Sequence, residues 1–343
     1  MTATDSFLMS DQPLPSIFPI VDTHTHFDAP LFDSDRELQA QEAYENGVHH
    51  LALVGYLYRH FDRLYDTQQA LDDLSQSVTT ENSDQLNLYP RAHIALGLHP
   101  FYIEQHTEAH LLAMAQMLTK QRPLAIGEIG LDTYTDAMKQ PENFAKQQRF
   151  FSAQLDMAVN HQLPVMLHIR KAHAQALALL KAHDYDAHKL GGIAHSFSGG
   201  VQEAKAFVKL GFKLGVTGQV TNPNAKKLRY AIQAAVADYG IGCLVIETDC
   251  PDMTPTMCQT LDNSSSVSEP SALGSAALES SVPRHRSHDE WGDRPAHNRN
   301  VPANLPWVLL TLSELLTVPP AELARQLWQN SCNALQTTWQ YPK

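Results

Sequence analysis

Two histidines that are two residues apart, His24 and His26, follow directly after a short apolar run near the start of the chain. On a β-strand, the side chains of residues i and i+2 lie on the same face, so both imidazoles point the same way. Neutral imidazole is the commonest protein ligand for zinc, manganese or iron, and it binds them without an unusual pKa. The pair therefore predicts half of a metal site, to which other parts of the chain must add ligands.

Further candidate ligands stand at the ends of other apolar runs. Glu128, His168, His195 and Asp249 each come at the end of such a run, and His99 follows another. A chance distribution would scatter these residue types through loops and helices. Because the carboxyl ends of all strands in a parallel barrel open onto one face, six side chains are expected to converge there: His24, His26, Glu128, His168, His195 and Asp249.

The elements that must position these side chains are strands that alternate with helices. Strands are expected at residues 17–22, 48–55, 91–97, 124–128, 165–169, 192–195, 213–216 and 244–248. Helices are expected between them at residues 35–46, 60–74, 106–121, 142–162, 172–183, 201–210 and 224–239. The strand interiors are continuously apolar, as in a parallel sheet that is buried on both faces. The predicted fold class is therefore α/β, a (β/α)8 TIM barrel.

Residues 256–297 interrupt this order. They are rich in Ser, Ala and Pro and show little apolar periodicity, and helical patterns resume at 302–316 and 320–335. We expect a flexible Ser-rich insertion after strand 8, at the rim that carries the site. The predicted organisation is an N-terminal tail at residues 1–16 and a single TIM-barrel domain at residues 17–343 that includes the insertion.

Composition narrows the class of protein. The 343 residues are 43% hydrophobic, enough for a large core, and the net charge of −12 excludes a nucleic-acid coat protein, which needs many Lys and Arg contacts to phosphates. The four cysteines have no Cys-x-x-Cys spacing, so no disulfide framework is indicated. No leader or long apolar segment is present, which predicts a cytoplasmic protein without membrane contact. No obligate protein partner is evident. Histidines in polar surroundings, such as His49 and His50, are expected at the surface.

The motifs resemble those of the TatD family of metal-dependent hydrolases, from about residue 18 to 337 outside the insertion. They are Asp-Thr-His-Thr-His-Phe-Asp at 22–28, Gly-Leu-His-Pro at 97–100, Glu-Ile-Gly-Leu-Asp at 128–132, His-Ile-Arg at 168–170, His-Ser-Phe-Ser-Gly at 195–199, Glu-Thr-Asp-Cys-Pro at 247–251 and Arg-Asn-Val-Pro at 299–302. Asp252 and Met253 are most like the YjjV branch. Cys250 departs from the small residue, such as Ala, that is usual there, and the insertion separates motifs that normally lie close together.

The resemblance implies a TIM barrel with two divalent metal ions per chain, such as Zn, Mg or Mn. Between them the ions would hold a water for in-line attack and steady the leaving oxygen. Glu128 and Asp249 would be catalytic, and Asp249 would orient or deprotonate that water. The implied ligands are His24, His26 and Asp249 for one ion, His168 and His195 for the other, and Glu128 as a bridge between them.

The predicted substrate contacts are His99, Asp132, Arg170 and Ser198. The resemblance suggests a phosphate contact for His99, for which an ordinary turn histidine is the alternative. Arg170 would share the face of His168 and fits either a substrate contact or an ion pair. Ser198 lies in a Ser-Gly-Gly turn whose backbone N–H groups can approach a phosphate oxygen.

These residues favour a metal-dependent deoxyribonuclease that acts on DNA ends or short single strands. One alternative is a hydrolase of a carboxylic ester or an amide, such as a D-aminoacyl-tRNA deacylase, because the same activated water can attack a carbonyl group. An alternative from another class is a catalytically inactive barrel that serves as a binding protein. Against this last hypothesis, every expected ligand position holds a ligand-type residue.

Overall fold

The computed structural model describes residues 17–81, 89–259 and 298–342. Eight strands form one sheet in sequence order, each parallel to the next. Their bounds are β1 (Ile20–Thr25), β2 (Val48–Val54), β3 (Arg91–Leu96), β4 (Ala125–Asp132), β5 (Val165–Arg170), β6 (Ile193–Ala194), β7 (Lys213–Val216) and β8 (Leu244–Ile246). The backbone N–H of Asp249 donates to the His24 carbonyl at 2.9 Å, which joins the two ends of the sheet. The predicted TIM barrel is confirmed.

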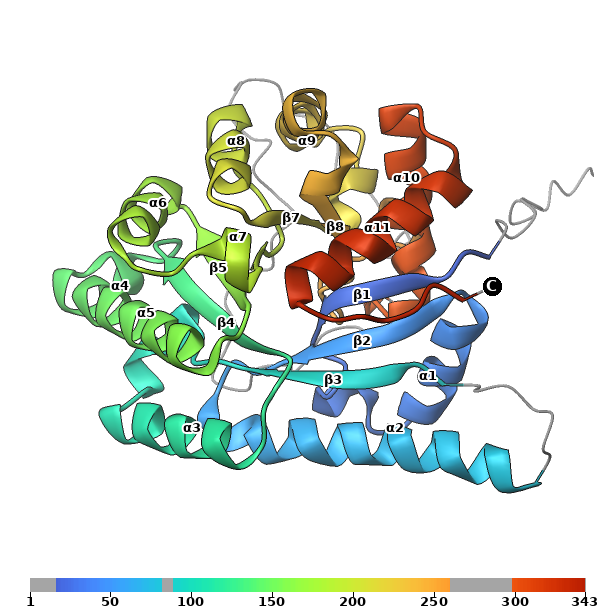
Figure 1. Ribbon diagram of the computed structural model, residues 1–343, viewed down its shortest axis with the longest axis horizontal. Helices are drawn as coiled ribbons and strands as arrows, with labels where there is room; N and C mark the ends of the chain where they lie inside the picture. The colour runs from blue at the N-terminus through green and yellow to red at the C-terminus, as the bar shows by residue number, and fades with distance from the viewer. Residues whose placement is uncertain (1–16, 82–88, 260–297, 343) are drawn as a thin grey trace, which may run out of the picture.

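Helices lie around the outside of the strands (Figure 1). The longer ones are α1 (Arg36–Glu45), α2 (Phe61–Glu81), α3 (Glu108–Lys120), α5 (Pro141–His161), α6 (His173–Ala182), α8 (Val201–Lys209), α9 (Lys226–Tyr239), α10 (Leu305–Leu316) and α11 (Pro320–Leu335). Each falls where a helix is expected from the sequence. Two single-turn helices, α4 (Asp136–Lys139) and α7 (Ala187–Leu190), were not expected, because four residues are too few to show a helical period.

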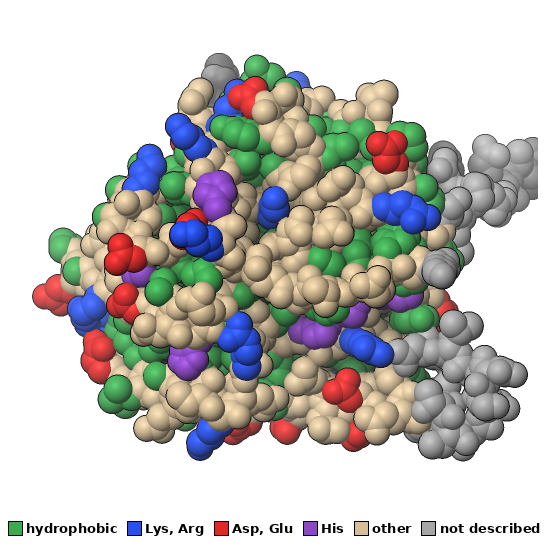
Figure 2. Space-filling view, in the orientation of Figure 1, with side chains coloured by type: hydrophobic (Ala, Val, Ile, Leu, Met, Phe, Trp, Pro, Cys, Tyr) green, Lys and Arg blue, Asp and Glu red, His purple; other side chains and the backbone are tan. Residues whose placement is uncertain are grey.

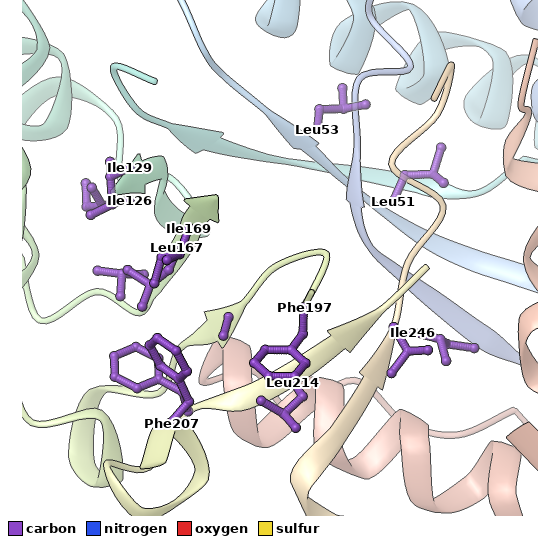
Figure 3. Close-up of a cluster of buried hydrophobic side chains, with 14 of the residues drawn as sticks. Leu51, Leu53, Ile126, Ile129, Leu167, Ile169, Phe197, Phe207, Leu214 and Ile246 are labelled. Atoms are coloured by element: carbon purple, nitrogen blue, oxygen red, sulfur yellow. The ribbon is translucent and has the colours of Figure 1, made fainter. Parts of the chain in front are cut away.

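Successive strand side chains alternate between two cores. Leu51 and Leu53 of β2 belong to the large core between strands and helices, part of which Figure 3 shows together with Phe207 of α8. Met166 of β5, by contrast, packs in a smaller cluster inside the barrel. Since alternate residues share a face, His168 and Arg170 continue the inward face of Met166. The alternation thus carries polar side chains to the interior at the carboxyl ends of the strands.

Strand β4 departs from this alternation just before Glu128. Ile126 pairs with Val165 and Ile129 pairs with Leu167, so β4 uses three residues where β5 uses two. An extra residue of this kind is a β-bulge, which re-aims a side chain. Ile126 and Ile129 both remain in the outer core, whereas Glu128 turns inward and meets the histidines of β1.

Helix α11 and the segment after it close the amino-terminal end of the barrel. Ala334 and Leu335 join the inner cluster, and Trp339 packs against it. His50, which was expected at the surface, is buried there and stacks on Trp339 with 4.2 Å between ring centroids. That expectation was wrong because His50 stands on a barrel strand, where an inward position is covered whatever its polarity.

Two strands are longer at their carboxyl ends than the sequence predicted. Strands β1 and β4 extend three and four residues further than expected, because their polar ends line the barrel interior rather than solvent. Only residues 256–259 of the predicted insertion, and none of the predicted tail at 1–16, lie within the described residues.

None of the described helices has the length and apolar character that crossing a membrane requires. Acidic and basic side chains are intermixed on the face shown in Figure 2.

Candidate metal centre

Histidines from β1, β5 and the end of β6 meet two carboxylates at the carboxyl end of the barrel. The Nε2 atoms of His24 and His26 lie 3.3 and 3.5 Å from Glu128 Oε2, and 3.9 and 3.8 Å from Asp249 Oδ1. His195 Nε2 lies 3.6 Å from the same Asp249 oxygen. The sixth expected side chain, His168, has its Nδ1 at 2.7 Å from Glu128 Oε1, so the structure brings all six together.

Three overlapping sets of these groups have ligand atoms within 4.8 Å of one another. Each set shares His24 or Glu128 with another set, so a cation bound by one set would lie beside ligand atoms of another. Asp249 groups with His195 as well as with His24, and the division of ligands between two ions, as implied by the resemblance, stays a prediction. The sets are His24, His26 and Glu128; His24, His195 and Asp249; and His99, Glu128 and His168.

His24 provides a test of whether these residues suit a metal ion. Its side chain is fully buried, yet neither ring nitrogen has a hydrogen-bond partner among the described residues. Buried polar atoms are nearly always hydrogen-bonded, and an orphaned imidazole nitrogen beside two carboxylates has the chemistry of a ligand. The donor set, imidazoles with carboxylates, is the one that zinc, manganese and similar divalent ions accept.

The second ring nitrogen of each neighbouring histidine faces a protein acceptor. His26 Nδ1 lies 3.0 Å from the Val54 carbonyl, which can only accept, so this nitrogen carries the proton and Nε2 keeps its lone pair. His195 Nδ1 lies 2.9 Å from Glu247 Oε1, a carboxylate contact without the geometry of a hydrogen bond. Such contacts fix the tautomer and orientation of metal-binding histidines. The Nε2 lone pair of His26 is therefore directed at Glu128 and Asp249, and His195 Nε2 lies 3.7 Å from Glu128 Oε1 and 3.6 Å from Asp249 Oδ1.

In His168 the two ring nitrogens have exchanged roles, so that Nδ1 and not Nε2 faces the centre. Its Nε2 lies 2.9 Å from Asp132 Oδ2, and its Nδ1 faces Glu128. Asp132 was predicted to contact substrate, but its carboxylate is fully buried and its other oxygen accepts from the backbone N–H of Tyr134 at 2.7 Å. This placement suits a residue that positions His168, and the predicted substrate contact stays untested.

His99 differs from the other rings in that its nitrogen facing Glu128 is the one that carries the proton. Its Nδ1 accepts from the backbone N–H of Phe101 at 2.9 Å, so in the neutral ring the proton is on Nε2. Nε2 lies 3.1 Å from Glu128 Oε1 and is placed to donate to it. A protonated nitrogen cannot bind a cation, so the contacts of His99 favour a hydrogen-bond donor over a ligand, in line with its predicted role outside the ligand set.

The histidines and carboxylates of the centre shift one another's pKa values toward their charged forms. Burial alone would raise the pKa of Glu128, but the rings of His99, His24 and His195 hold this pKa well below its usual value. In the same way, His195 outweighs burial and lowers the pKa of Asp249 to about 2. Burial opposes a charge on His195, yet the carboxylates of Glu247, Asp249 and Glu128 raise its pKa well above the usual value. The pocket is therefore built to hold positive charge.

Two buried carboxylates to which sequence reasoning assigned no role support the centre. Glu247 accepts from the Ser196 backbone N–H at 2.6 Å, and a Cβ at Gly215 would lie 2.2 Å from its Oε1. Asp22 accepts from the Thr248 hydroxyl at 2.5 Å, and burial raises the pKa of Asp22 to about 7. The signal for Glu247 was available, because it shares the inward face of Val245 on β8. No pattern in the sequence indicates the link from Asp22 to Thr248.

The other predicted substrate contacts lie around the centre. Arg170 is partly buried at the end of β5, where its guanidinium covers the Tyr134 ring with 3.5 Å to the ring centroid. Ser198 is exposed in the turn before α8. In that turn, the Gly200 N–H donates to Glu203 Oε2 at 2.9 Å, so this N–H is already occupied. The roles of Arg170 and Ser198 stay predictions.

Comparison with known proteins agrees with this geometry. The model of the TatD related DNase family matches residues 21–336. The chain is 36% identical over 235 residues to the uncharacterized metal-dependent hydrolase YjjV of Escherichia coli strain K12, covering 68% of this chain and 80% of that protein. It is 30% identical over 226 residues to the 3'-5' ssDNA/RNA exonuclease TatD of Salmonella typhimurium, covering 65% and 76% of the two chains.

A solved structure shows the same likeness. The crystal structure of Escherichia coli YjjV matches with a TM-score of 0.67 and 29% identity, over 93% of this chain and 98% of that chain. The family motifs quoted from the sequence lie in the matched span, and the resemblance to the YjjV branch is confirmed. The chain therefore belongs to the TatD family of metal-dependent hydrolases.

Proposed function

We propose that this chain is a metal-dependent nuclease that hydrolyses phosphodiester bonds of DNA, at ends or in short single strands. The observation that carries the proposal is the convergence of buried imidazoles on Glu128 and Asp249 at the mouth of the barrel. A relative named 3'-5' ssDNA/RNA exonuclease supports this substrate class. The net charge of −12 suits a short or terminal strand better than a long duplex held by many cationic contacts.

The metal requirement follows from the ligand chemistry. His24, His26, His168, His195, Asp249 and the bridging Glu128 are the residues that would hold two divalent ions, such as Zn, Mg or Mn. When bound, such ions supply Lewis acidity and make a water molecule nucleophilic near neutral pH. Everything else that the reaction needs must come from the side chains around them.

Asp249 would orient the attacking water. Its pKa of about 2 keeps it ionised at every physiological pH, so its oxygens accept hydrogen bonds rather than store a proton. Glu247 and Asp132 hold the rings of His195 and His168 in position. His99 can donate from Nε2 to an anionic oxygen in place of Glu128, which is how it would contact a phosphate. The remaining residues thus bind, orient and shield, and none needs to change its covalent state.

The cellular setting and the extent of the domain are further proposals. All four cysteines are free thiols, which fits a reducing compartment, and we place the protein in the cytoplasm without an obligate protein partner. We assign residues 17–343 to one hydrolase domain, because the strands from β1 to β8 share a single sheet and α11 packs against its interior.

A substrate panel tests the nuclease. Full-length protein loaded with Zn, Mn or Mg would be given single-stranded oligonucleotides labelled at the 3' or the 5' end, duplexes with blunt ends, and carboxylic esters including a D-aminoacyl-tRNA. The expected result is metal-dependent shortening of single strands from one end. Hydrolysis of the esters without hydrolysis of the oligonucleotides would overturn the proposal in favour of the deacylase alternative, and activity on neither would favour an inactive barrel.

A further inference from the structure

A large aromatic side chain with two cations beside it lies at the rim of the metal centre. Tyr134 stands between β4 and the short helix α4, and 36% of its surface is exposed. The Arg170 guanidinium lies 3.5 Å from the centroid of the Tyr134 ring, and Lys171 Nζ lies 5.0 Å from it. Neither the position of Tyr134 nor its contacts follow from the motifs of the sequence.

Hydrogen bonds fix the backbone of the loop that carries this ring relative to the metal centre. One oxygen of Asp132 accepts from the Tyr134 backbone N–H at 2.7 Å, and the other lies 2.9 Å from His168 Nε2. Thr133 ties the same loop to the end of β5, through its N–H to the Arg170 carbonyl at 3.0 Å and its hydroxyl to the Lys171 carbonyl at 2.9 Å. A single carboxylate therefore separates the Tyr134 backbone from a candidate metal ligand.

We propose that Tyr134, backed by Arg170, is a stacking platform for one base of a single-stranded nucleic-acid substrate, and that Lys171 contacts a neighbouring phosphate. This inference rests on the proposed nuclease function and names the residue that holds the base. Aromatic rings and arginine planes stack on every nucleobase regardless of sequence. In an acidic chain that cannot gain much affinity from phosphate contacts, a stacked base is a way to hold a strand end that depends little on charge.

The alternative is a surface cation–π pair that stabilises the two loops and touches no substrate. The two interpretations differ in what happens when the base is removed from the substrate. A stacking platform loses its advantage on an abasic nucleotide, whereas a structural pair affects all substrates alike. Tyr134→Ala removes the ring, and Tyr134→Phe keeps the ring while removing the hydroxyl, so the two variants separate stacking from any hydrogen bond of the phenol.

The kinetic test uses metal-loaded full-length protein and a series of short single strands, each with an abasic analogue at a different position from the attacked end. On the intact strand, Tyr134→Ala should lower kcat/KM by roughly 5-fold to 150-fold, the range for loss of one stacked base. For one abasic position, wild type and Tyr134→Ala should differ by less than about twofold. Tyr134→Phe should stay within about twofold of wild type throughout.

A second readout needs no catalysis. Chelator-treated full-length protein would be mixed with a set of strands, each of which carries fluorescent 2-aminopurine at a different position from the end. Wild type and Tyr134→Phe should quench its fluorescence, because stacking on an aromatic ring quenches this base, and Tyr134→Ala should not. Tyr230→Ala is the matched control, because Tyr230 is an exposed tyrosine of the outer helix α9 and should behave as wild type.

The outcomes are distinguishable. Equal losses for Tyr134→Ala on intact and abasic strands at every position, together with unchanged quenching, would overturn the platform and leave the nuclease standing. If wild type hydrolyses no oligonucleotide with any metal, the nuclease proposal fails, and the quenching experiment still decides whether Tyr134 stacks on a base. Circular dichroism of each variant checks that the loop change leaves the fold intact.

Discussion

The two ends of the barrel each hold buried histidines, and only one end has the chemistry of a metal site. At the carboxyl end, His24, His26 and His195 surround Glu128 and Asp249. At the amino end, His50 Nδ1 lies 3.0 Å from His93 Nε2, and both rings pack against Trp339. The three candidate ligand sets found among the described residues all lie at the carboxyl end.

The difference lies in the carboxylates. At the mouth, Glu247, Asp249 and Glu128 overcome burial and raise the pKa of His195. At the closed end, burial and the neighbouring His93 lower the pKa of His50 to about 3, and burial lowers the pKa of His93 to about 4. Imidazoles beside buried carboxylates favour a bound cation. The imidazoles packed against Trp339 have lowered pKa values, stay neutral and serve as part of the core.

The largest expected effect comes from removing the charge of Glu128. Glu128→Gln conserves volume but takes away the carboxylate that contacts all five histidines at the mouth. We expect kcat/KM for a single-stranded oligonucleotide to fall by at least about a thousandfold, equivalent to the several kcal/mol that a metal centre supplies. The far-ultraviolet circular dichroism should be unchanged. Activity within tenfold of wild type would remove Glu128 from the metal centre.

A smaller effect is expected from Glu247→Gln. The carboxylate lies 2.9 Å from His195 Nδ1 and touches no other histidine of the centre. Loss of such a supporting contact should weaken metal affinity by roughly 10-fold to 100-fold, measured by competition with a chromophoric chelator. Gly215→Ala is a second route to the same change, because its Cβ would collide with Glu247. If neither variant alters metal affinity, the carboxylate does not position His195.

Acidification should weaken metal binding at the mouth. Neighbouring carboxylates outweigh burial and raise the pKa of His26, His168 and His195, and a protonated imidazole binds no cation. Protons therefore compete with the metal from above the usual histidine pKa of ~6.5 downward. Metal affinity measured from about pH 8 to pH 6 should fall by at least about tenfold. A flat profile would mean that these rings are structural.

The smallest effect is expected at the closed end. His93→Gln preserves a polar atom near the position of Nε2, so activity should stay within about twofold of wild type, the scale of a substitution away from the site. Its effect should appear in the pH dependence of unfolding. Because the folded-state pKa values are depressed, the folded rings bind fewer protons than the unfolded ones below about pH 6.5. Stability is therefore complete above that pH and is lost as the pH falls toward the folded values.

The measurement is urea unfolding of wild type and His93→Gln in chelator, between about pH 7 and pH 4.5. Each depressed histidine contributes up to about 1.4 kcal/mol per pH unit in this window. The variant should show a shallower loss of stability than wild type on acidification. Identical slopes would show that His93 titrates alike in both states and that the closed end is not selective against protons.

Much of the mouth was predictable because barrel topology places every strand end on one face. The convergence of all six expected side chains, Glu128 and His195 included, could be predicted from their place after apolar runs alone. The bulge in β4 that turns Glu128 inward could not, since it shows only in the pairing with β5. The prediction for His50 at the closed end was wrong for a related reason. His50 follows another histidine at the start of β2, and only strand register reveals that it faces inward.

The most direct test of the central claim compares the same substitution at the two ends. His24→Ala and His50→Ala each remove a buried imidazole from a barrel strand, and they differ in whether carboxylates stand beside it. Bound divalent metal per chain would be measured by elemental mass spectrometry on full-length proteins purified without chelator. We expect His50→Ala to retain the metal content of wild type and His24→Ala to lose at least one ion. Equal metal content in all three proteins, or loss in His50→Ala alone, would contradict the assignment of the mouth as the metal centre.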